Sequence, residues 1–139
     1  MRNCTPISSI MTKRVIALTR EDDLEKADRL FKRYKIKHIP IVSREMVIGM
    51  LSYTDLMRIS FAETSSTSEE RIDTVVYNMF SIEQVMAKHV ITVTEDTCVR
   101  EASNILAKAP FHALPVVENG FLKGIVTTSD LLNYFSKQF

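Results

Sequence analysis

Hydrophobic and polar positions follow the same order twice along this chain. A β-branched stretch, VIALT in the first half and VITVT in the second, predicts a short strand after a turn of helix (ISSIM, IEQVM). Apolar residues at helical spacing follow in segments 24–34 and 99–106 and predict an amphipathic helix. Two more strands (IPIV and VIGMLS; LPVV and LKGIVT) and a closing helix, from about Thr54 or Ser129, complete each half. The pattern therefore predicts two β-α-β-β-α units.

The two halves are copies of one sequence unit. A shift of 75 positions, the separation of Met11 from Met86, lays segment 7–57 over segment 82–132 without a gap. Identical pairs include Pro40/Pro115, Gly49/Gly124 and Asp55/Asp130. Neither copy of about 50 residues buries enough apolar surface to be stable alone. The repeat thus predicts an α/β fold in which two β-α-β-β-α repeats pack with pseudo-two-fold symmetry.

The expected domain boundaries follow from the repeat. Residues 1–62 form repeat 1, residues 82–139 form repeat 2, and residues 63–81 form a linker. The Ser/Thr/Glu-rich part of the linker predicts a mobile loop, and its apolar end, RIDTVVYNMF, predicts a short helix. The linker is either a connector packed on the body or part of a dimer contact.

Polar residues mark the predicted helix starts. Asp22 and Thr97 stand where an N-cap is expected, and Glu25 would complete a capping box with Asp22. At the last strand-to-helix break, Thr127, Ser129 and Asp130 bring two hydroxyls and a carboxylate together. These three could serve helix capping, catalysis or ligand binding.

Composition and charge narrow the class of protein. The chain has 139 residues, 45% apolar and 25% charged, with a formal net charge of +1. This balance suits one soluble globular protein and argues against a large nucleic-acid footprint. No apolar run approaches the ~20 residues of a membrane span, and no signal-peptide pattern opens the sequence. We therefore expect a cytoplasmic protein with no nucleic-acid partner and no membrane span.

The cysteine count predicts no metal or disulfide framework. Cys4 and Cys98 are too few for either a zinc set or a framework of bridges. Cys98 falls at the first turn of a predicted helix, where its pKa could be lowered, but we expect it to pack as a small hydrophobic side chain.

Three motifs recur at the same offset and together resemble a known family. They are an M-x-K-x-V-I opening, an apolar-Pro-apolar-Val strand and a G-h-h-[ST]-x-[ST]-D-L ending, where h is hydrophobic. The chain resembles a tandem pair of CBS domains, a Bateman module. The resemblance implies a regulatory sensor and not an enzyme, which binds AMP, ADP, ATP, S-adenosylmethionine or a related ligand between its repeats. It also implies a disc-shaped homodimer and a separate effector protein, with the adenosyl ligand as effector and no required cofactor or metal.

The resemblance also assigns roles to residues of the last motif and the first helix. The motif aspartates would hold the ribose hydroxyls: Asp55 and Asp130. The motif hydroxyls would face ribose or phosphate: Ser52, Thr54, Thr127 and Ser129. The helix-start residues would touch the ribose, and the alanines would lie against the base: Asp22, Thr97, Ala27 and Ala102.

Further residues are implied around the base. Those before the strand proline would form a wall for base and phosphate: Ile36, Lys37, Phe111 and His112. The backbone of the first strand would read the adenine edge: Val15, Ile16, Val90 and Ile91. A cleft would combine one repeat's wall with the other repeat's motif. Thr97, Ala102, Phe111 and His112 would then join Ser52, Thr54 and Asp55, whereas Lys37 would join Thr127, Ser129 and Asp130.

Physical chemistry is compatible with these roles. A carboxylate accepts hydrogen bonds from two ribose hydroxyls, and the N-terminus of a helix attracts phosphate. Cations near the motifs could add charge-assisted bonds: Lys37, His38, Arg58 and His112. Tyr53 and Thr128 stand where a basic residue is common in phosphate-binding members, and Asp22 would repel a nearby phosphate. The sequence thus predicts a nucleoside without fixing its phosphates.

Plainer interpretations stay open beside these. Asp55 and Asp130 could simply begin a helix, His112 could be a surface histidine, and the basic run KRYKIKH could be a solvated helix face. A constitutive dimeric scaffold with degenerate ligand sites is the main alternative function. A nucleotide hydrolase is the weakest, because no nucleophile elbow, P-loop or metal triad is present.

Overall fold

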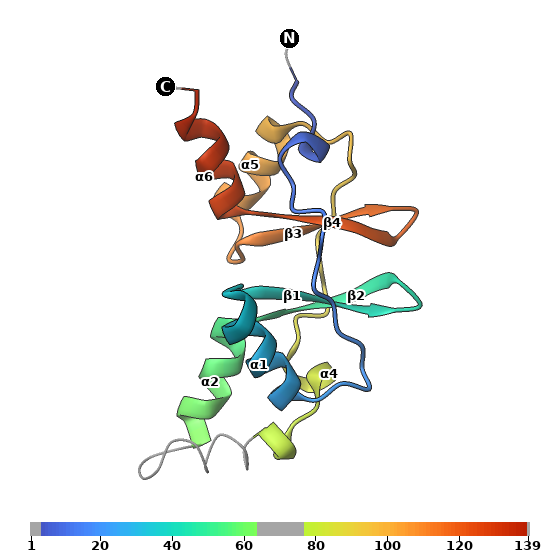
Figure 1. Ribbon diagram of the computed structural model, residues 1–139, viewed down its shortest axis with the longest axis vertical. Coiled ribbons are helices and arrows are strands. Elements are labelled where there is room, and N and C mark those ends of the chain that lie inside the picture. Colours follow the sequence, from blue (N-terminus) through green and yellow to red (C-terminus); the bar gives the residue numbers. More distant parts are fainter. Residues whose placement is uncertain (1–3, 64–76, 139) are drawn as a thin grey trace. The chain divides into compact units, whose positions relative to one another are not determined.

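The computed structural model describes residues 4–63 and 77–138 and shows a mixed α/β protein (Figure 1). The first repeat contributes the elements η1 (a 3-10 turn, Ile7–Ser9), α1 (Leu24–Tyr34), β1 (His38–Ser43), β2 (Met46–Ser52) and α2 (Tyr53–Glu63). The second contributes α4 (Ile82–Val85), α5 (Val99–Lys108), β3 (Ala113–Glu118), β4 (Phe121–Thr127) and α6 (Thr128–Ser136). The predicted α/β class is confirmed, with both closing helices beginning one residue earlier than expected.

The chain divides into two compact units that exchange their leading segments. The α1 unit comprises residues 16–44 and 48–89, and the α5 unit comprises residues 1–15, 45–47 and 90–139. In the α5 unit, Thr12 and Ile125 exchange backbone hydrogen bonds of 2.8 and 3.0 Å. In the α1 unit, Met50 and Ala87, their equivalents at the offset of 75, exchange bonds of 3.0 and 2.8 Å. The segment that opens each sequence repeat therefore belongs to the compact unit of the other repeat.

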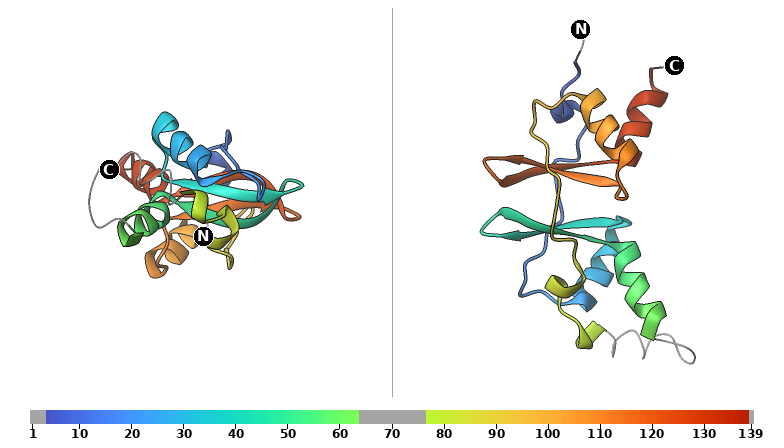
Figure 2. Two further views of the ribbon diagram at one scale, coloured as in Figure 1. Left: turned by 90° about the horizontal axis from the view of Figure 1, so that it is seen from below. Right: turned by 180° about the vertical axis from the view of Figure 1, so that it is seen from behind.

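A hairpin covered by two helices forms the frame of each unit. Helices α5 and α6 lie on one face of the β3–β4 hairpin, and α1 and α2 lie on one face of the β1–β2 hairpin (Figures 1 and 2). In the antiparallel β3–β4 pair, Ala113 lies opposite Thr127. Both hairpins turn through two residues with positive φ, Asn119–Gly120 and Arg44–Glu45. Such turns match the right-handed twist of the flanking strands.

The predicted first strand of each repeat is wrong in extent. Only Leu18 of VIALT and Val93 of VITVT pair with the sheet, in single parallel bridges to Ile41 and Val116. Leu18 accepts from Val42 at 2.8 Å, and Val93 accepts from Val117 at 2.8 Å. The β-branched side chains indicated strand propensity, but each segment pairs with the edge of the sheet at one residue only and does not form a full strand.

The predicted N-caps are displaced by one residue. Helix α1 is capped by Asp23, whose side chain accepts from the backbone N–H of Lys26, so Glu25 forms no capping box. Helix α5 begins after Cys98, which provides no side-chain cap. Asp and Thr favour both caps and preceding turns, and the sequence pattern alone does not separate adjacent polar positions.

The two cysteines are joined, contrary to expectation. Cys4 and Cys98 form a disulfide, with their Cα atoms 5.2 Å apart. The backbone brings them together, because Thr5 accepts from Val99 N–H at 2.8 Å and Thr97 accepts from Ile7 N–H at 2.7 Å. Two cysteines separated by 94 positions gave no sequence signal of this proximity.

Each unit has its own hydrophobic core. Leu18, Leu24, Ile39, Leu51 and Leu56 are buried at the centre of the α1 unit. The core of the α5 unit is formed by equivalent positions and their neighbours, including Ile7, Val93, Val99, Leu114, Val126 and Leu131. Most of these residues come from the apolar positions of the repeat, so the helical and strand periodicities identified the buried faces.

Part of the predicted linker falls outside the described residues. The segment predicted to be a mobile loop lies almost entirely in residues 64–76, as does most of RIDTVVYNMF, and the description resumes with the buried Tyr77. Within residues 4–63 and 77–138, no helix has the length and apolarity that a membrane crossing requires.

Candidate functional site

The last motif of repeat 2 forms a capping box at the start of α6. The hydroxyl of Thr127 accepts from the backbone N–H of Asp130 at 3.1 Å. The Oδ2 atom of Asp130 in turn accepts from the backbone N–H of Thr127 at 3.0 Å. These two bonds satisfy N–H groups that would otherwise lack partners at a helix start. The plainer interpretation of Asp130 as a capping residue therefore describes a real contact.

The equivalent motif of repeat 1 is related but not identical. Ser52 Oγ accepts from the backbone N–H of Asp55 at 3.0 Å, as Thr127 does for Asp130. The Oδ1 atom of Asp55, however, accepts from Arg58 Nη1 at 2.8 Å. The Arg58 side chain is 70% exposed and that of Asp55 is 26% exposed, so this ion pair is accessible to solvent and weak.

Each motif carboxylate has one oxygen without a protein partner among the described residues. In the described part of the chain, Asp130 Oδ1 and Asp55 Oδ2 accept no hydrogen bond from the protein. A carboxylate offers about four acceptor positions, so one protein contact leaves room for hydroxyl donors. Capping and ribose binding are thus compatible roles for the same aspartate.

The start of each closing helix lies against the predicted base wall of its own repeat. Tyr53 N–H donates to Lys37 O at 2.8 Å, and Thr128 N–H donates to His112 O at 2.9 Å. These bonds bring Lys37 beside the Ser52–Asp55 motif, and His112 beside the motif of α6. The combination of one repeat's wall with the other's motif stays a prediction.

The side chains of Lys37 and His112 are exposed, whereas the residues immediately before them, Ile36 and Phe111, are half-buried. Ile36 packs against the core of the α1 unit, and Phe111 packs against the core of the α5 unit. An apolar residue followed by a basic or imidazole side chain therefore borders each motif.

Asp22 and Thr97 close equivalent turns before the first helices. Asp22 Oδ2 accepts from Thr19 N–H at 2.8 Å, and Thr97 Oγ1 accepts from Thr94 N–H at 3.0 Å. Asp22 Oδ1 also accepts from Lys26 Nζ at 2.9 Å. Burial opposes ionisation of Asp22, but the bonds from Thr19 and Lys26 outweigh it and hold the pKa of this carboxyl below its ordinary value.

The remaining predicted contacts differ in accessibility. Ala27 and Ala102 are fully buried in the two cores, while Thr54 and Ser129 are exposed beside the motif aspartates. Val15, Ile16 and Val90 are half-buried, and Ile91 is 47% exposed. Exposed hydroxyls and first-segment residues can meet a ligand directly, whereas the alanines are covered by their own units.

Lys37, Arg58 and His112 lie near the motifs, and the described residues form no metal cluster. Lys37 and His112 are exposed, and Arg58 is paired with Asp55. Across residues 4–63 and 77–138, no group of three or more His, Cys, Asp or Glu side chains is placed to hold a metal ion. The described chemistry of the motifs is that of hydroxyl, carboxylate and backbone groups.

The profile of the CBS domain matches residues 7–62 and 82–137, which is most of the chain. The chain belongs to the CBS domain family. The two matched segments contain the Ser52–Asp55 and Thr127–Asp130 motifs described above. The resemblance inferred from the three sequence motifs is therefore confirmed.

Known relatives match this chain over part of a longer sequence. The uncharacterized protein MJ1225 of Methanocaldococcus jannaschii is 28% identical over 131 residues, covering 94% of this chain and 47% of that protein. Inosine-5′-monophosphate dehydrogenase of Korarchaeum cryptofilum is 30% identical over 132 residues, covering 94% of this chain and 24% of the enzyme. The CBS pair thus spans less than half of the length of these relatives.

Solved CBS domain pairs have the same fold. The CBS pair of protein MJ0100, in complex with 5′-methylthioadenosine and S-adenosyl-L-methionine, has a TM-score of 0.81 at 23% identity and covers 99% of this chain and 100% of its own. CBSX2 in complex with AMP has a TM-score of 0.77 at 19% identity, with coverage of 96% and 97%. Both neighbours hold adenosyl compounds.

Sequence reasoning missed two threonines of this CBS pair. Thr19 and Thr94 donate their backbone N–H groups to the side chains of Asp22 and Thr97, in the turns before the first helices. They are an identical pair at the repeat offset, which was a usable signal. The motif side chains were identified correctly as neighbours, but their engagement in caps depended on the backbone geometry of the strand-to-helix turn.

Proposed function

We propose that this CBS pair is a ligand-sensing regulatory module for an adenine nucleotide or related adenosyl compound. The ligand binds between the repeats, and the module signals to a separate partner protein as a homodimer. The supporting observation is that the two strand-to-helix motifs, Ser52–Asp55 and Thr127–Asp130, match each other. In each motif the aspartate keeps one carboxylate oxygen that could accept from ribose hydroxyls. The adenosyl ligands of MJ0100 and CBSX2 favour the same ligand class.

Signalling requires more than binding. A ligand shifts a regulatory equilibrium only by its difference in affinity for the two states of the protein. Arg58 provides such a difference in this proposal. The ribose takes the unpartnered Oδ2 of Asp55, and a phosphate of the same ligand competes with Asp55 Oδ1 for the Arg58 guanidinium.

A titration with Asp130 variants tests the ligand proposal. Calorimetry of the wild-type protein with AMP, ADP, ATP and S-adenosylmethionine should show saturable heat for at least one of them. Asp130→Asn keeps an oxygen that can accept from Thr127 N–H but removes the charged acceptor of the ribose. We expect it to weaken binding about tenfold, as loss of one charge-assisted bond would, with little change in thermal stability.

Asp23→Asn is the matched control, because Asp23 also makes a side-chain bond at a helix start, from the backbone N–H of Lys26, and lies outside the proposed site. It should leave ligand affinity unchanged. Absence of heat with all four ligands at millimolar concentration would refute the proposal. Equal affinity of the wild-type and Asp130→Asn proteins would remove Asp130 from the ribose site.

A constitutive dimeric scaffold is the second candidate. It is favoured by one observation, namely that the motif aspartates already have structural partners in Thr127 and Arg58. A scaffold predicts that Asp55→Ala and Asp130→Ala change partner capture no more than they change stability. Adenosyl binding with an altered partner affinity would contradict it.

A further inference from the structure

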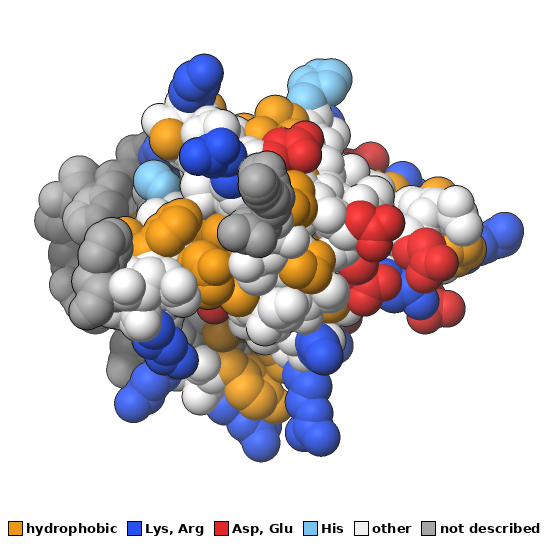
Figure 3. All heavy atoms as spheres, turned by 90° about the horizontal axis from the view of Figure 1, so that it is seen from above, with side chains coloured by type: hydrophobic (Ala, Val, Ile, Leu, Met, Phe, Trp, Pro, Cys, Tyr) orange, Lys and Arg blue, Asp and Glu red, His pale blue; other side chains and the backbone are white. Residues whose placement is uncertain are grey.

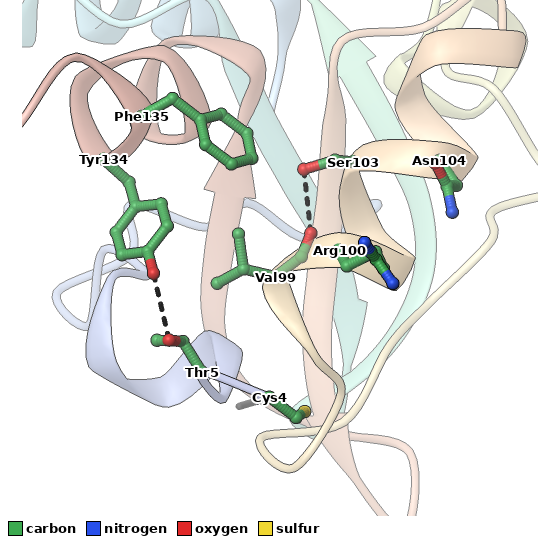
Figure 4. A pocket seen from close by; sticks show the side chains of 8 residues that line it. All are labelled: Cys4, Thr5, Val99, Arg100, Ser103, Asn104, Tyr134 and Phe135. Atoms are coloured by element: carbon green, nitrogen blue, oxygen red, sulfur yellow. Dashed lines mark hydrogen bonds between the residues drawn. The ribbon is translucent and has the colours of Figure 1, made fainter. Parts of the chain in front are cut away.

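A cavity of about 300 Å³ lies on the surface of the α5 unit, and none of the adenosyl residues discussed above lines it (Figure 4). Helices α5 and α6 and the N-terminal segment surround it. Its lining side chains are Cys4, Thr5, Val99, Arg100, Ser103, Asn104, Tyr134 and Phe135. None of them belongs to the proposed adenosyl site, so the cavity requires a separate explanation.

One side of the cavity is aromatic and held in place. Tyr134 and Phe135 make an edge-to-face contact with ring centroids 5.4 Å apart. The Tyr134 hydroxyl is hydrogen-bonded to Thr5 Oγ1 at 3.0 Å, and Figure 4 shows this ring reaching from α6 to the N-terminal segment. Phe135 remains 37% exposed. These rings offer a fixed apolar surface to a ligand body.

The opposite side carries a cation with no protein partner. Arg100 and Asn104 are exposed on α5, and within the described residues neither side chain makes a hydrogen bond or ion pair. Ser103 Oγ donates to Val99 O at 2.8 Å and is already engaged. No acidic side chain lines the cavity. A free guanidinium with planar N–H donors is the group that best recognises a carboxylate.

Figure 3 looks onto this face and shows hydrophobic side chains in its middle, Lys and Arg side chains at several places along its border, and most acidic side chains gathered on one side. The helix start beneath Arg100 adds a partial positive charge, since α5 begins at Val99.

Repeat 1 does not share this set of side chains. At the offset of 75, Glu25 stands in place of Arg100 and Ile59 in place of Tyr134. The positions that build the shared fold are apolar in both repeats, whereas these cavity positions differ in charge and ring content. The cavity chemistry is therefore a property of repeat 2 and is not imposed by the CBS fold.

We propose that this cavity binds a small carboxylic acid with an aromatic or apolar body. The Arg100 guanidinium holds the carboxylate, and the rings of Tyr134 and Phe135 pack against the body. A volume of about 300 Å³ lies at the low end of ligand cavities and suits a single-ring acid better than a nucleotide. The site is independent of the adenosyl site.

A titration with benzoate tests this site. Amide NMR correlation spectra of the full chain in non-reducing buffer should show saturable shifts at Val99–Asn104 and Tyr134–Phe135. Benzyl alcohol has the same ring without the charge and should bind at least about fivefold more weakly, because it lacks the charge-assisted bonds to Arg100. Shifts scattered over the surface, or none at millimolar benzoate, would overturn the proposal.

Variants separate the cation from the rings. Arg100→Gln should weaken benzoate about tenfold and leave benzyl alcohol unchanged. Arg29→Gln changes an exposed arginine of α1 in the other unit and should alter neither. Phe135→Ala should weaken both probes, and its exposed position makes loss of folding unexpected. Equal benzoate affinity in the wild-type and Arg100→Gln proteins would contradict the assignment, whatever the adenosyl titrations give.

Discussion

At the scale of single residues, equivalent positions of the repeats perform one structural task with different side chains. Asp22 and Thr97 both accept from a backbone N–H three residues earlier. Asp22 alone carries a charge and also pairs with Lys26. Either side chain can therefore make the turn contact, but only the carboxylate of Asp22 adds an electrostatic contribution to stability.

Asp22→Thr should therefore change how stability depends on pH. The threonine can keep the turn bond but removes the ion pair, which costs about 0.3–0.5 kcal/mol near neutral pH. The pKa of Asp22 is lowered in the folded state, so its contribution is present above the ordinary value of 3.8 and is lost as pH falls through the folded pKa. Urea unfolding at neutral and acidic pH should show the difference between the proteins shrinking below that value.

The control is Asp22→Asn, which also lacks an ionisable group and should give the same pH dependence as Asp22→Thr. A stability difference from wild type that persists unchanged in strong acid would show that the Asp22 charge contributes nothing.

At the scale of elements, the recurring Gly and Met pairs have a common cause. A Cβ on Gly124 would lie 2.6 Å from Met11 Sδ and 2.9 Å from Thr12 O. A Cβ on Gly49 would meet Met86 Sδ and lie 3.0 Å from Ala87 O. The glycines let the leading segment of one sequence repeat approach the strand of the other, and the methionines cover the gap. The identical pairs at the offset thus preserve one packing contact.

Gly124→Ala should destabilise the protein by about 1–3 kcal/mol, because the methionine can move but the Thr12 backbone must shift. Gly49→Ala should have a similar effect in the α1 unit, since the same contacts recur there. Chemical unfolding measures both. The double variant Met11→Ala with Gly124→Ala should recover little stability, since Thr12 O still obstructs the Cβ; full recovery would assign the strain to the methionine alone.

At the scale of the whole molecule, the disulfide ties two distant parts of the sequence into one unit. Cys4 lies on the N-terminal segment, and Cys98 immediately precedes α5. The bridge reinforces the backbone bonds between Thr5 and Val99 and between Ile7 and Thr97. It closes a long loop, so it restricts the unfolded chain strongly.

Reduction of the disulfide should lower the free energy of unfolding by about 2–4 kcal/mol, the usual range for a native bridge. Thermal unfolding with and without reductant measures the change. Cys4→Ser protein should unfold at the same lower temperature in both buffers and provides the control. Free thiols detected by alkylation of the folded wild-type protein in non-reducing buffer would contradict the bridge.

The sequence by itself determined the repeat, the α/β class, the CBS family and the side chains of both closing motifs. These features follow from local propensity and from a hydrophobic pattern that recurs at an offset of 75 residues. Only the tertiary structure decided that Asp23 and Cys98 precede the helices, that one residue of each first strand pairs, and that Asp130 caps α6. It alone placed Cys4 beside Cys98 and gathered Arg100 with Tyr134. These features depend on contacts between distant segments, whose geometry is set by the packing of the chain and leaves no local pattern.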